Sequence, residues 1–201
     1  MVVDVSSAAA SERQYTYRVD HSMYGEIGTY RNNVRVSGND TAIDTEADIR
    51  ISLLGIILYR QHASRIERWT GDRLVYFHGV TVENGKATQI DGRAEADRFI
   101  VTSPTGTVTA PATIRLANPR SVGALSGDVI LMPDTGFVTN MNVSGGEETS
   151  LVIDGKVNQA QLYQIETGIG IRYDAWVDDH GMPVKFDIRD GLSIITFTLV
   201  R

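Results

Sequence analysis

The stretch Val80-Thr81-Val82-Glu83-Asn84-Gly85-Lys86-Ala87-Thr88-Gln89-Ile90 decides the fold class. Its centre is the dipeptide Asn84-Gly85, which separates two short runs of strand-forming residues. Asn-Gly is the strongest short signal for a β-hairpin, because both central residues of a type I′ turn take positive φ. The sequence therefore predicts two antiparallel strands joined by a tight turn at this point.

Similar turn signals continue in both directions from this hairpin, and the shortest intervals between them are roughly 10 to 15 residues. They are Gly38-Asn39-Asp40, Thr70-Gly71-Asp72, Ser103-Pro104-Thr105-Gly106, Asp154-Gly155, His180-Gly181 and Asp190-Gly191. Regular turns with short intervening runs are typical of an all-β protein. We therefore expect strands to follow one another with almost no helix between them.

Several of these runs place aromatic or aliphatic residues at alternate positions, which is typical of a strand with one buried face. A long antiparallel sheet lined in this way has to close into a barrel or curl around its contents. We predict an all-β fold, a strongly curved antiparallel sheet or barrel of about 11–14 strands. The three clearest rows are Tyr15, Tyr17, Val19 and His21; Leu74, Tyr76, His78 and Val80; and Ile171, Tyr173, Ala175 and Val177.

One stretch interrupts the strand pattern. Leu116 to Gly136 contains Pro119, Pro133 and several glycines. We expect a short loop-helical crossover at about 112–135 that joins two halves of the sheet, with about six strands after Gly136. Residues 14–201 then form a single β-rich domain, and residues 1–13 a disordered N-terminus.

Composition limits the function. The chain has 201 residues, no cysteine and a formal net charge of -6, with 42% hydrophobic and 22% charged residues. This is an ordinary globular composition, and the acidic balance argues against a nucleic-acid partner. No run approaches the roughly 18 apolar residues of a transmembrane helix.

The small residues Ser7-Ala8-Ala9-Ala10-Ser11 resemble the surroundings of a signal-peptidase site, although no apolar segment precedes them. We interpret the N-terminus as the remnant of a removed signal peptide with an added methionine. A flexible native N-terminus is the alternative. The first interpretation predicts a periplasmic or secreted protein.

Four stretches resemble an uncharacterised family of exported bacterial β-proteins, a domain of unknown function that is distantly similar to LolA/LolB-type lipoprotein carriers. The resemblance implies a periplasmic β-rich protein with an apolar interior, and it implies no particular activity. The stretches are turns and strand anchors rather than catalytic signatures. They are Gly25–Tyr30, Glu67–Leu74 followed by Asn84-Gly85, Leu131–Gly136, and Tyr173–Lys185.

No catalytic or metal-binding motif is complete. The nucleophile pentapeptide G-x-S-x-G is missing, and the four histidines form no H-x-H or H-x-x-x-H pair. Asp178-Asp179-His180 is best interpreted as a solvated turn, so we expect no metal and no cofactor. His78 and His21, each in an aromatic row, are the candidates for acid–base chemistry.

The first function hypothesis is a carrier that holds a hydrophobic small molecule or lipid in a β-lined cavity. It depends on the aromatic rows and on the apolar run Leu53–Tyr59, with Tyr17, Tyr30, His78 and Arg172 available to orient a head group. The candidate ligand-binding residues are Tyr15, Tyr17, Tyr30, Trp69, Tyr76, His78, Tyr173 and Trp176.

Two other hypotheses stay open. One is an enzyme, an isomerase, cyclase, lyase or hydrolase, that acts on an apolar substrate in the same cavity by His, Asp or Tyr chemistry. The other is an envelope interaction module that uses an exposed strand edge. The missing motifs favour a protein that is not an enzyme, and the sequence does not determine the oligomeric state.

Overall fold

The computed structural model describes residues 11–118 and 127–200, and these form one sheet of fifteen strands. The strand order is β8-β7-β6-β5-β4-β3-β2-β1-β15-β14-β13-β12-β11-β10-β9, and β9 and β10 pair in parallel while the other pairs are antiparallel. The strands are β1 (Ser11–His21), β2 (Gly25–Ser37), β3 (Asp40–Leu53), β4 (Ile56–Thr70), β5 (Arg73–Glu83), β6 (Lys86–Glu95), β7 (Arg98–Ser103), β8 (Gly106–Pro111), β9 (Arg115–Leu116), β10 (Val129–Leu131), β11 (Val138–Ile153), β12 (Lys156–Thr167), β13 (Arg172–Val177), β14 (Pro183–Asp190) and β15 (Ser193–Val200).

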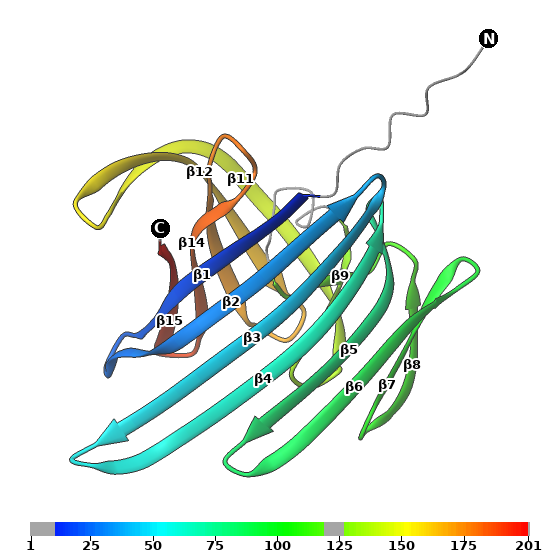
Figure 1. Ribbon diagram of the computed structural model, residues 1–201, viewed down its shortest axis with the longest axis horizontal. Helices are drawn as coiled ribbons and strands as arrows, with labels where there is room; N and C mark the ends of the chain where they lie inside the picture. The colour runs from blue at the N-terminus through cyan, green and yellow to red at the C-terminus, as the bar shows by residue number, and fades with distance from the viewer. Residues whose placement is uncertain (1–10, 119–126, 201) are drawn as a thin grey trace.

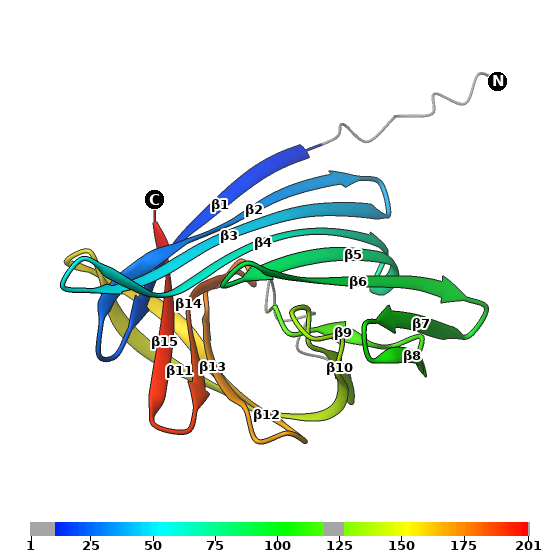
Figure 2. The ribbon, with the colours of Figure 1, turned by 90° about the horizontal axis from the view of Figure 1, so that it is seen from below.

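The sheet is strongly curved but does not close. Strands β1 to β6 form a long arch, and β11 to β15 bend round its other side (Figures 1 and 2). Because β1 pairs with β15, the first and last strands lie side by side in the middle of the sheet. The two edges, β8 and β9, lie apart from each other in the strand order, and β9 and β10 lie inside the arch beneath β5 and β6 (Figure 2). The predicted all-β, curved antiparallel architecture is confirmed.

The observed crossover differs from the predicted one. The described parts of residues 112–135 contain turns and the short strands β9 and β10, and no helix. These two strands raise the count above the predicted range, and the other thirteen described strands fall within it. Residues 119–126 of the expected helical turns lie outside the described residues. After Gly136 the described residues form five strands where about six were expected, and the first of them, β11, is 16 residues long.

The start of the domain also shifts. Strand β1 begins at Ser11, three residues before the expected start at Gln14, and Ser11 pairs with Val36 of β2.

One of the three predicted rows is broken by a β-bulge. On β4, Trp69 pairs with Leu74 and its neighbour Arg68 pairs with Tyr76, so Val75 is an extra residue in β5. A bulge of this kind exchanges the two faces of the strand beyond it. Leu74 is therefore buried as expected. Beyond the bulge, however, Phe77 faces the interior, and its neighbour Tyr76 does not. The prediction that Tyr76 and His78 share the inner face with Leu74 is wrong for this reason.

Two apolar clusters fill the interior of the arch. The larger one centres on four rings from β1, β2, β14 and β15, in which Phe186 stacks on Phe197 at 4.2 Å between centroids. Tyr17 and Tyr30 meet these rings edge-on, and Tyr17 Oη donates a hydrogen bond of 2.9 Å to the carbonyl of Pro183. These contacts join the two ends of the chain.

The smaller cluster fixes the returning segment inside the arch. Leu116 of β9 and Leu131 of β10 pack with Phe77 and Phe99 of the sheet, and all four side chains are buried. Burial of such side chains contributes about 1.5–3 kcal/mol each. The returning segment therefore closes one end of the space that the larger cluster surrounds.

A substitution at Gly28 tests the close pairing of β2 with β3. A Cβ at this position would lie 1.9 Å from the backbone carbonyl oxygen of Asp48, which cannot move without breaking the ladder. We expect Gly28→Ala to lower the free energy of unfolding by about 1–3 kcal/mol, measured by urea denaturation. Gly25→Ala is the control, since a Cβ there meets nothing within 4 Å and adds backbone strain alone. An equal loss in both variants would contradict this account.

Candidate binding cavity

A cavity of about 440 Å³ lies inside the arch, between the larger cluster and the loop that follows β10. Its volume lies within the range of about 300–1,000 Å³ that is usual for small-molecule sites. Most of its wall is apolar. The lining residues are Ile27, Ala47, Ile49, Ile51, Ala117, Met132, Pro133, Phe186, Ile188, Ile195 and Phe197, with His21, Tyr30, Tyr59, Gln61, Arg65, Asn118, Asp134, Tyr173 and Ser193.

Successive side chains of a strand point to opposite faces of the sheet, and this alternation decides which of them line the cavity. On β3, Ala47, Ile49 and Ile51 are two residues apart and point to the same face. On β4, Tyr59, Gln61 and Arg65 follow the same period. Both rows face inward because their intervening residues occupy the solvent-exposed outer face.

The inner end of the cavity is polar. Arg65 Nη2 donates a hydrogen bond of 2.5 Å to Asp134 Oδ1, and the Thr81 hydroxyl donates to the same oxygen at 2.8 Å. Asp134 belongs to a tight turn in which Gly136 N donates to the carbonyl of Met132 at 2.9 Å. Burial lowers the pKa of Arg65, but Asp134 and its other neighbours raise it by more, so the guanidinium stays charged.

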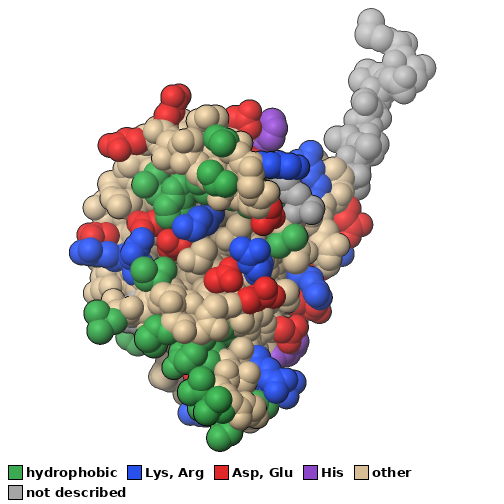
Figure 3. All heavy atoms as spheres, turned by 90° about the vertical axis from the view of Figure 1, so that its left-hand side faces the viewer, with side chains coloured by type: hydrophobic (Ala, Val, Ile, Leu, Met, Phe, Trp, Pro, Cys, Tyr) green, Lys and Arg blue, Asp and Glu red, His purple; other side chains and the backbone are tan. Residues whose placement is uncertain are grey.

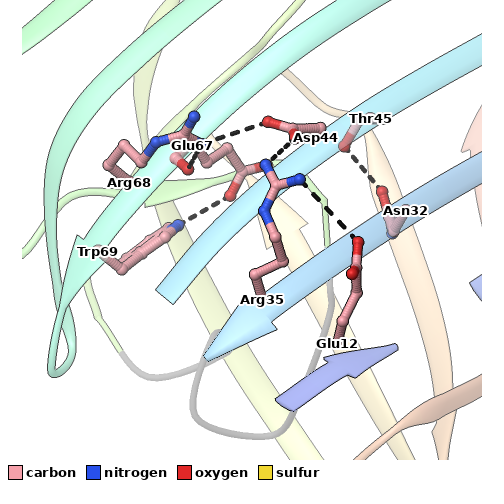
Figure 4. A network of polar contacts seen from close by, with 8 residues as sticks. All are labelled: Glu12, Asn32, Arg35, Asp44, Thr45, Glu67, Arg68 and Trp69. Carbon is pink, nitrogen blue, oxygen red and sulfur yellow. Dashed lines mark hydrogen bonds and ion pairs between the residues drawn. The ribbon is translucent and has the colours of Figure 1, made fainter. Parts of the chain in front are cut away.

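Behind this ion pair lies a polar group that is buried more deeply than Asp134, whose side chain is 42% exposed. Glu67 of β4 is 2% exposed, and its Oε2 accepts a hydrogen bond of 2.9 Å from Trp69 Nε1. Its Oε1 accepts from Asn118 Nδ2 at 3.5 Å. Thr45 donates to Asn32 Oδ1 at 2.7 Å on the neighbouring strands (Figure 4). The interior therefore changes from apolar to polar along the inner face of β4.

The outer face of the same strands carries a second polar network. Arg35 pairs with Asp44, and Arg68 Nη1 lies 3.2 Å from Asp44 Oδ1, while Arg35 also approaches Glu12 at 4.0 Å (Figure 4). These pairs are at least a third exposed, and exposed ion pairs contribute little to stability. Alternate side chains of β4 thus point to opposite faces, and Arg68 Nη1 links them by donating to the backbone carbonyl of Glu67 at 2.9 Å.

Two polar atoms beside the cavity have no hydrogen-bond partner among the described residues. They are Tyr30 Oη and Arg65 Nε, and both side chains are at least nine-tenths buried. The nearby Thr45 hydroxyl donates to Asn32, so it can offer Tyr30 Oη only an acceptor lone pair. An unsatisfied buried polar group costs about 1–3 kcal/mol. Neighbouring atoms cover both of them, so this cost belongs to the folded protein itself.

The tyrosines at the cavity are held in their neutral form. Burial raises the pKa of Tyr59 to about 12, and burial raises the pKa of Tyr30 and Tyr173 further. Tyr173 Oη lies 3.8 Å from Met132 Sδ, a weak acceptor. These hydroxyls can therefore act as hydrogen-bond donors to a ligand over the whole physiological pH range.

The cavity opens toward one end of the sheet. His21, Ile51, Tyr59 and Ser193 lie at strand ends next to turns, and antiparallel register brings these turns to the same end. Large exposed hydrophobic side chains concentrate on the turns there. They are Met23 and Tyr24 (β1–β2), Leu53, Leu54, Ile56, Ile57 and Leu58 (β3–β4), Ile169 (β12–β13) and Leu192 (β14–β15).

The structure places the predicted ligand-binding residues in different environments. Tyr30 and Tyr173 line the cavity. Tyr17 is buried in the larger cluster and Tyr15 packs against it, without reaching the cavity wall. Trp69 is buried in the smaller cluster, next to Glu67.

The remaining candidates face away from the cavity. Tyr76 is 42% exposed on the outer face of β5. Trp176 alternates with the buried residues of β13, and Lys185 Nζ lies 4.2 Å from the centre of its ring. Arg172, proposed to orient a head group, is exposed and pairs with Glu166. Their aromatic or basic character did not reveal which face of the strand they occupy.

The two histidines proposed for acid–base chemistry have different positions. His21 lines the mouth of the cavity, where its Nδ1 accepts a hydrogen bond from Met23 N. His78 lies on the outer face of β5, and its Nδ1 is 2.7 Å from Asp91. The Val75 bulge is the reason that His78 does not reach the interior.

The apolar run Leu53–Tyr59 has a different position from the one expected. Tyr59 lines the cavity, but Leu53 to Leu58 form the exposed tip of the β3–β4 hairpin. Sequence reasoning also missed Arg65 and Asp134. Arg65, Glu67 and Trp69 occupy alternate positions of β4 and therefore share one face of the strand. The tryptophan in this row could have indicated that the charge of Arg65 lies inside.

Other ligand types find less support among the described residues. No group of three His, Cys, Asp or Glu residues could hold a metal ion there. The Asp178 carboxylate accepts hydrogen bonds from the backbone amides of His180 and Met182, so it stabilises its own turn. The described part of the chain also contains no helix that is long and apolar enough to cross a bilayer.

Comparison with known proteins gives a family and a fold. A family model described as a domain of unknown function, DUF6134, matches residues 23–200. The chain belongs to this family. No curated protein matches it. The expected membership of an uncharacterised β-protein family is therefore confirmed, whereas these comparisons do not show the likeness to LolA/LolB carriers.

A solved structure supports the architecture of this family member. The chain is similar to a β-barrel-like protein of the domain of unknown function DUF1849 from Brucella abortus, with a TM-score of 0.70. The two chains are 13% identical, and the match covers 94% of this chain and 96% of the other. At this identity the similarity concerns the fold alone.

The buried tyrosines predict a loss of stability in alkali. Their raised pKa means that between about pH 10 and the folded-state pKa the folded chain holds protons that the unfolded chain has released. Stability is therefore fully present below about pH 10 and falls above it, by about 1.4 kcal/mol per pH unit for each buried tyrosine. Urea denaturation between about pH 8 and about pH 11 measures the fall.

An absorbance titration of the phenolates provides the check. In the folded protein, a fraction of the eight tyrosines should titrate late or only on unfolding, whereas in urea all should titrate together. If the folded protein released all eight protons near pH 10, the buried placement of Tyr17, Tyr30 and Tyr173 would be wrong.

Proposed function

We propose that this protein binds a hydrophobic or amphipathic small molecule, such as a lipid, in the cavity inside the arch. The observation that carries the proposal is a space of about 440 Å³ with apolar walls and a polar inner end, open at the end of the sheet where the turns are apolar. Release of water from apolar walls contributes roughly 25 cal/mol per Å² of buried surface before the costs of association. The expected periplasmic or secreted location stays a prediction.

The chemistry of the inner end favours a ligand with one polar group. Asn118 and Tyr173 line this end beside the ion pair of Arg65 with Asp134, which compensates the charge of Arg65 on one side. A ligand whose apolar body occupies the outer part of the cavity can place a hydrogen-bond acceptor at this end. Apolar area then gives affinity, and the donors fix the orientation.

Filling the cavity tests whether it is the binding site. Ala47 is 5% exposed, lies opposite Tyr30 on β3, and points into the cavity. We expect wild-type protein to bind the neutral fluorescent probe N-phenylnaphthylamine. The Ala47→Phe variant should bind it at least about tenfold more weakly, because the added ring occupies the space.

The control for this experiment is Tyr76→Ser on the outer face of β5, which should bind the probe as wild type does. Circular dichroism and urea denaturation confirm that both variants are folded. Failure of the wild-type protein to bind the probe, or equal binding by Ala47→Phe, would contradict the proposal.

Removing the Tyr173 hydroxyl tests the predicted orientation. We expect Tyr173→Phe to cost little stability, because the Tyr173 hydroxyl pairs with the weak acceptor Met132 Sδ at 3.8 Å. Its affinity for palmitate, which has a carboxylate head, should fall about five- to tenfold, while its affinity for N-phenylnaphthylamine should not change. Competition between the two ligands, followed by fluorescence, measures both. An equal loss for both ligands would show that the hydroxyl does not contact a head group.

A further inference from the structure

The tip of the β3–β4 hairpin has an unusual surface for a protein in water. Leu54 is 95% exposed, and Leu53, Ile56, Ile57 and Leu58 are each about half exposed or more. Five large apolar side chains therefore surround one turn. Figure 3 shows hydrophobic side chains gathered at the lower end of this face of the molecule, where the hairpin lies.

The turn itself is occupied by a residue that does not favour its conformation. Leu54 and Gly55 have φ of 51° and 82°, as the central residues of a two-residue hairpin turn. The other non-glycine residues with positive φ in such turns are Asn84 and Asp154, which tolerate it well, and Ala96, which is small. A leucine here is unfavourable both in its backbone conformation and in its exposure. An outlier of this kind points to a role in an interaction.

Positive charge lies just behind the apolar tip. Arg50 of β3 and Arg60 of β4 are directly opposite each other in the ladder, and both are exposed. Neither guanidinium forms an ion pair with a described residue, and residues 49–61 contain no acidic side chain. Like charges in direct opposition destabilise a strand pair. An anionic partner on this side would relieve the repulsion.

The spacing of these features matches the layers of a membrane surface. Arg50 precedes Leu53 by three residues, which corresponds to about 10 Å along an extended strand. Interfacial apolar segments enter a bilayer to a depth of about 5–10 Å. With the tip at that depth, both arginines reach the level of the lipid phosphates.

We propose that the β3–β4 tip docks on an anionic phospholipid surface, with Leu53 to Leu58 in the acyl boundary and Arg50 and Arg60 on the phosphates. The formal net charge of -6 does not oppose this contact strongly, because charges beyond about 10 Å are screened at physiological salt. The tip lies at the same end of the sheet as the cavity mouth. Docking therefore turns the mouth toward the bilayer.

Flotation with vesicles tests the docking. We expect wild-type protein to float with vesicles of equal parts palmitoyl-oleoyl-phosphatidylglycerol and palmitoyl-oleoyl-phosphatidylcholine, and to float poorly with phosphatidylcholine alone. The double variant Leu54→Asn/Ile56→Asn should bind the anionic vesicles at least about tenfold more weakly. The double variant Arg50→Gln/Arg60→Gln should lose about tenfold or more, since each basic residue contributes about a factor of five.

A matched control removes apolar area at the other end of the sheet. Val152 and Val157 face each other on the β11–β12 hairpin and are each 69% exposed. The variant Val152→Asn/Val157→Asn should float as wild type does. Leu54→Asn also fits the turn better than leucine, so this variant should fold, and thermal unfolding measures that directly.

The same variants separate docking from cavity binding. Leu54→Asn/Ile56→Asn should still bind N-phenylnaphthylamine, so its loss of vesicle binding cannot come from a damaged cavity. Failure of wild type to float, or equal loss in the Val152→Asn/Val157→Asn control, would overturn the proposal. A concentration-dependent dimer in sedimentation velocity without vesicles, abolished by the tip variant, would also overturn it and assign the tip to a second copy of the chain.

Discussion

The ion pair between Arg65 and Asp134 determines where the polar end of the cavity lies inside this protein. The two residues are 69 positions apart in sequence, one in the middle of β4 and the other in the loop after β10. A buried guanidinium without its partner is costly, so the returning segment is held where Asp134 can reach it. The pair thereby forms the inner end of the cavity and separates it from the smaller apolar cluster.

A sheet that curls without closing has two edges, and each edge exposes unpaired backbone groups. Here β9 is two residues long and lies inside the arch, and β8 is six residues long and ends at Pro111. Short edges and a terminal proline limit pairing with other chains. The two edges of the described sheet therefore offer little backbone for pairing with another chain.

The two ends of the sheet differ in chemistry. At the cavity mouth four turns carry large exposed apolar side chains, whereas turns at the opposite end contain sequences such as Gly38-Asn39-Asp40 and Gly71-Asp72. The cavity and the apolar tip thus lie at one end, although they are made by different residues. Binding inside the arch and docking on a membrane can be tested separately for this reason.

The sequence alone determined the strands, the turns and the all-β class of this protein. Turn chemistry is local: Asn84-Gly85 and Asp154-Gly155 favour positive φ because of their own residue types and adopt it here. Alternation around Tyr17 or Tyr173 marks one buried face. Tertiary structure decided which face of each strand lies inside. The extra residue Val75 exchanged the faces of β5, and the position of Arg65 depended on a partner far along the chain. Most of the residues that line the cavity could not be predicted, because the face on which a side chain lies depends on accumulated register and on long-range partners. A turn, in contrast, depends on two or three adjacent residues.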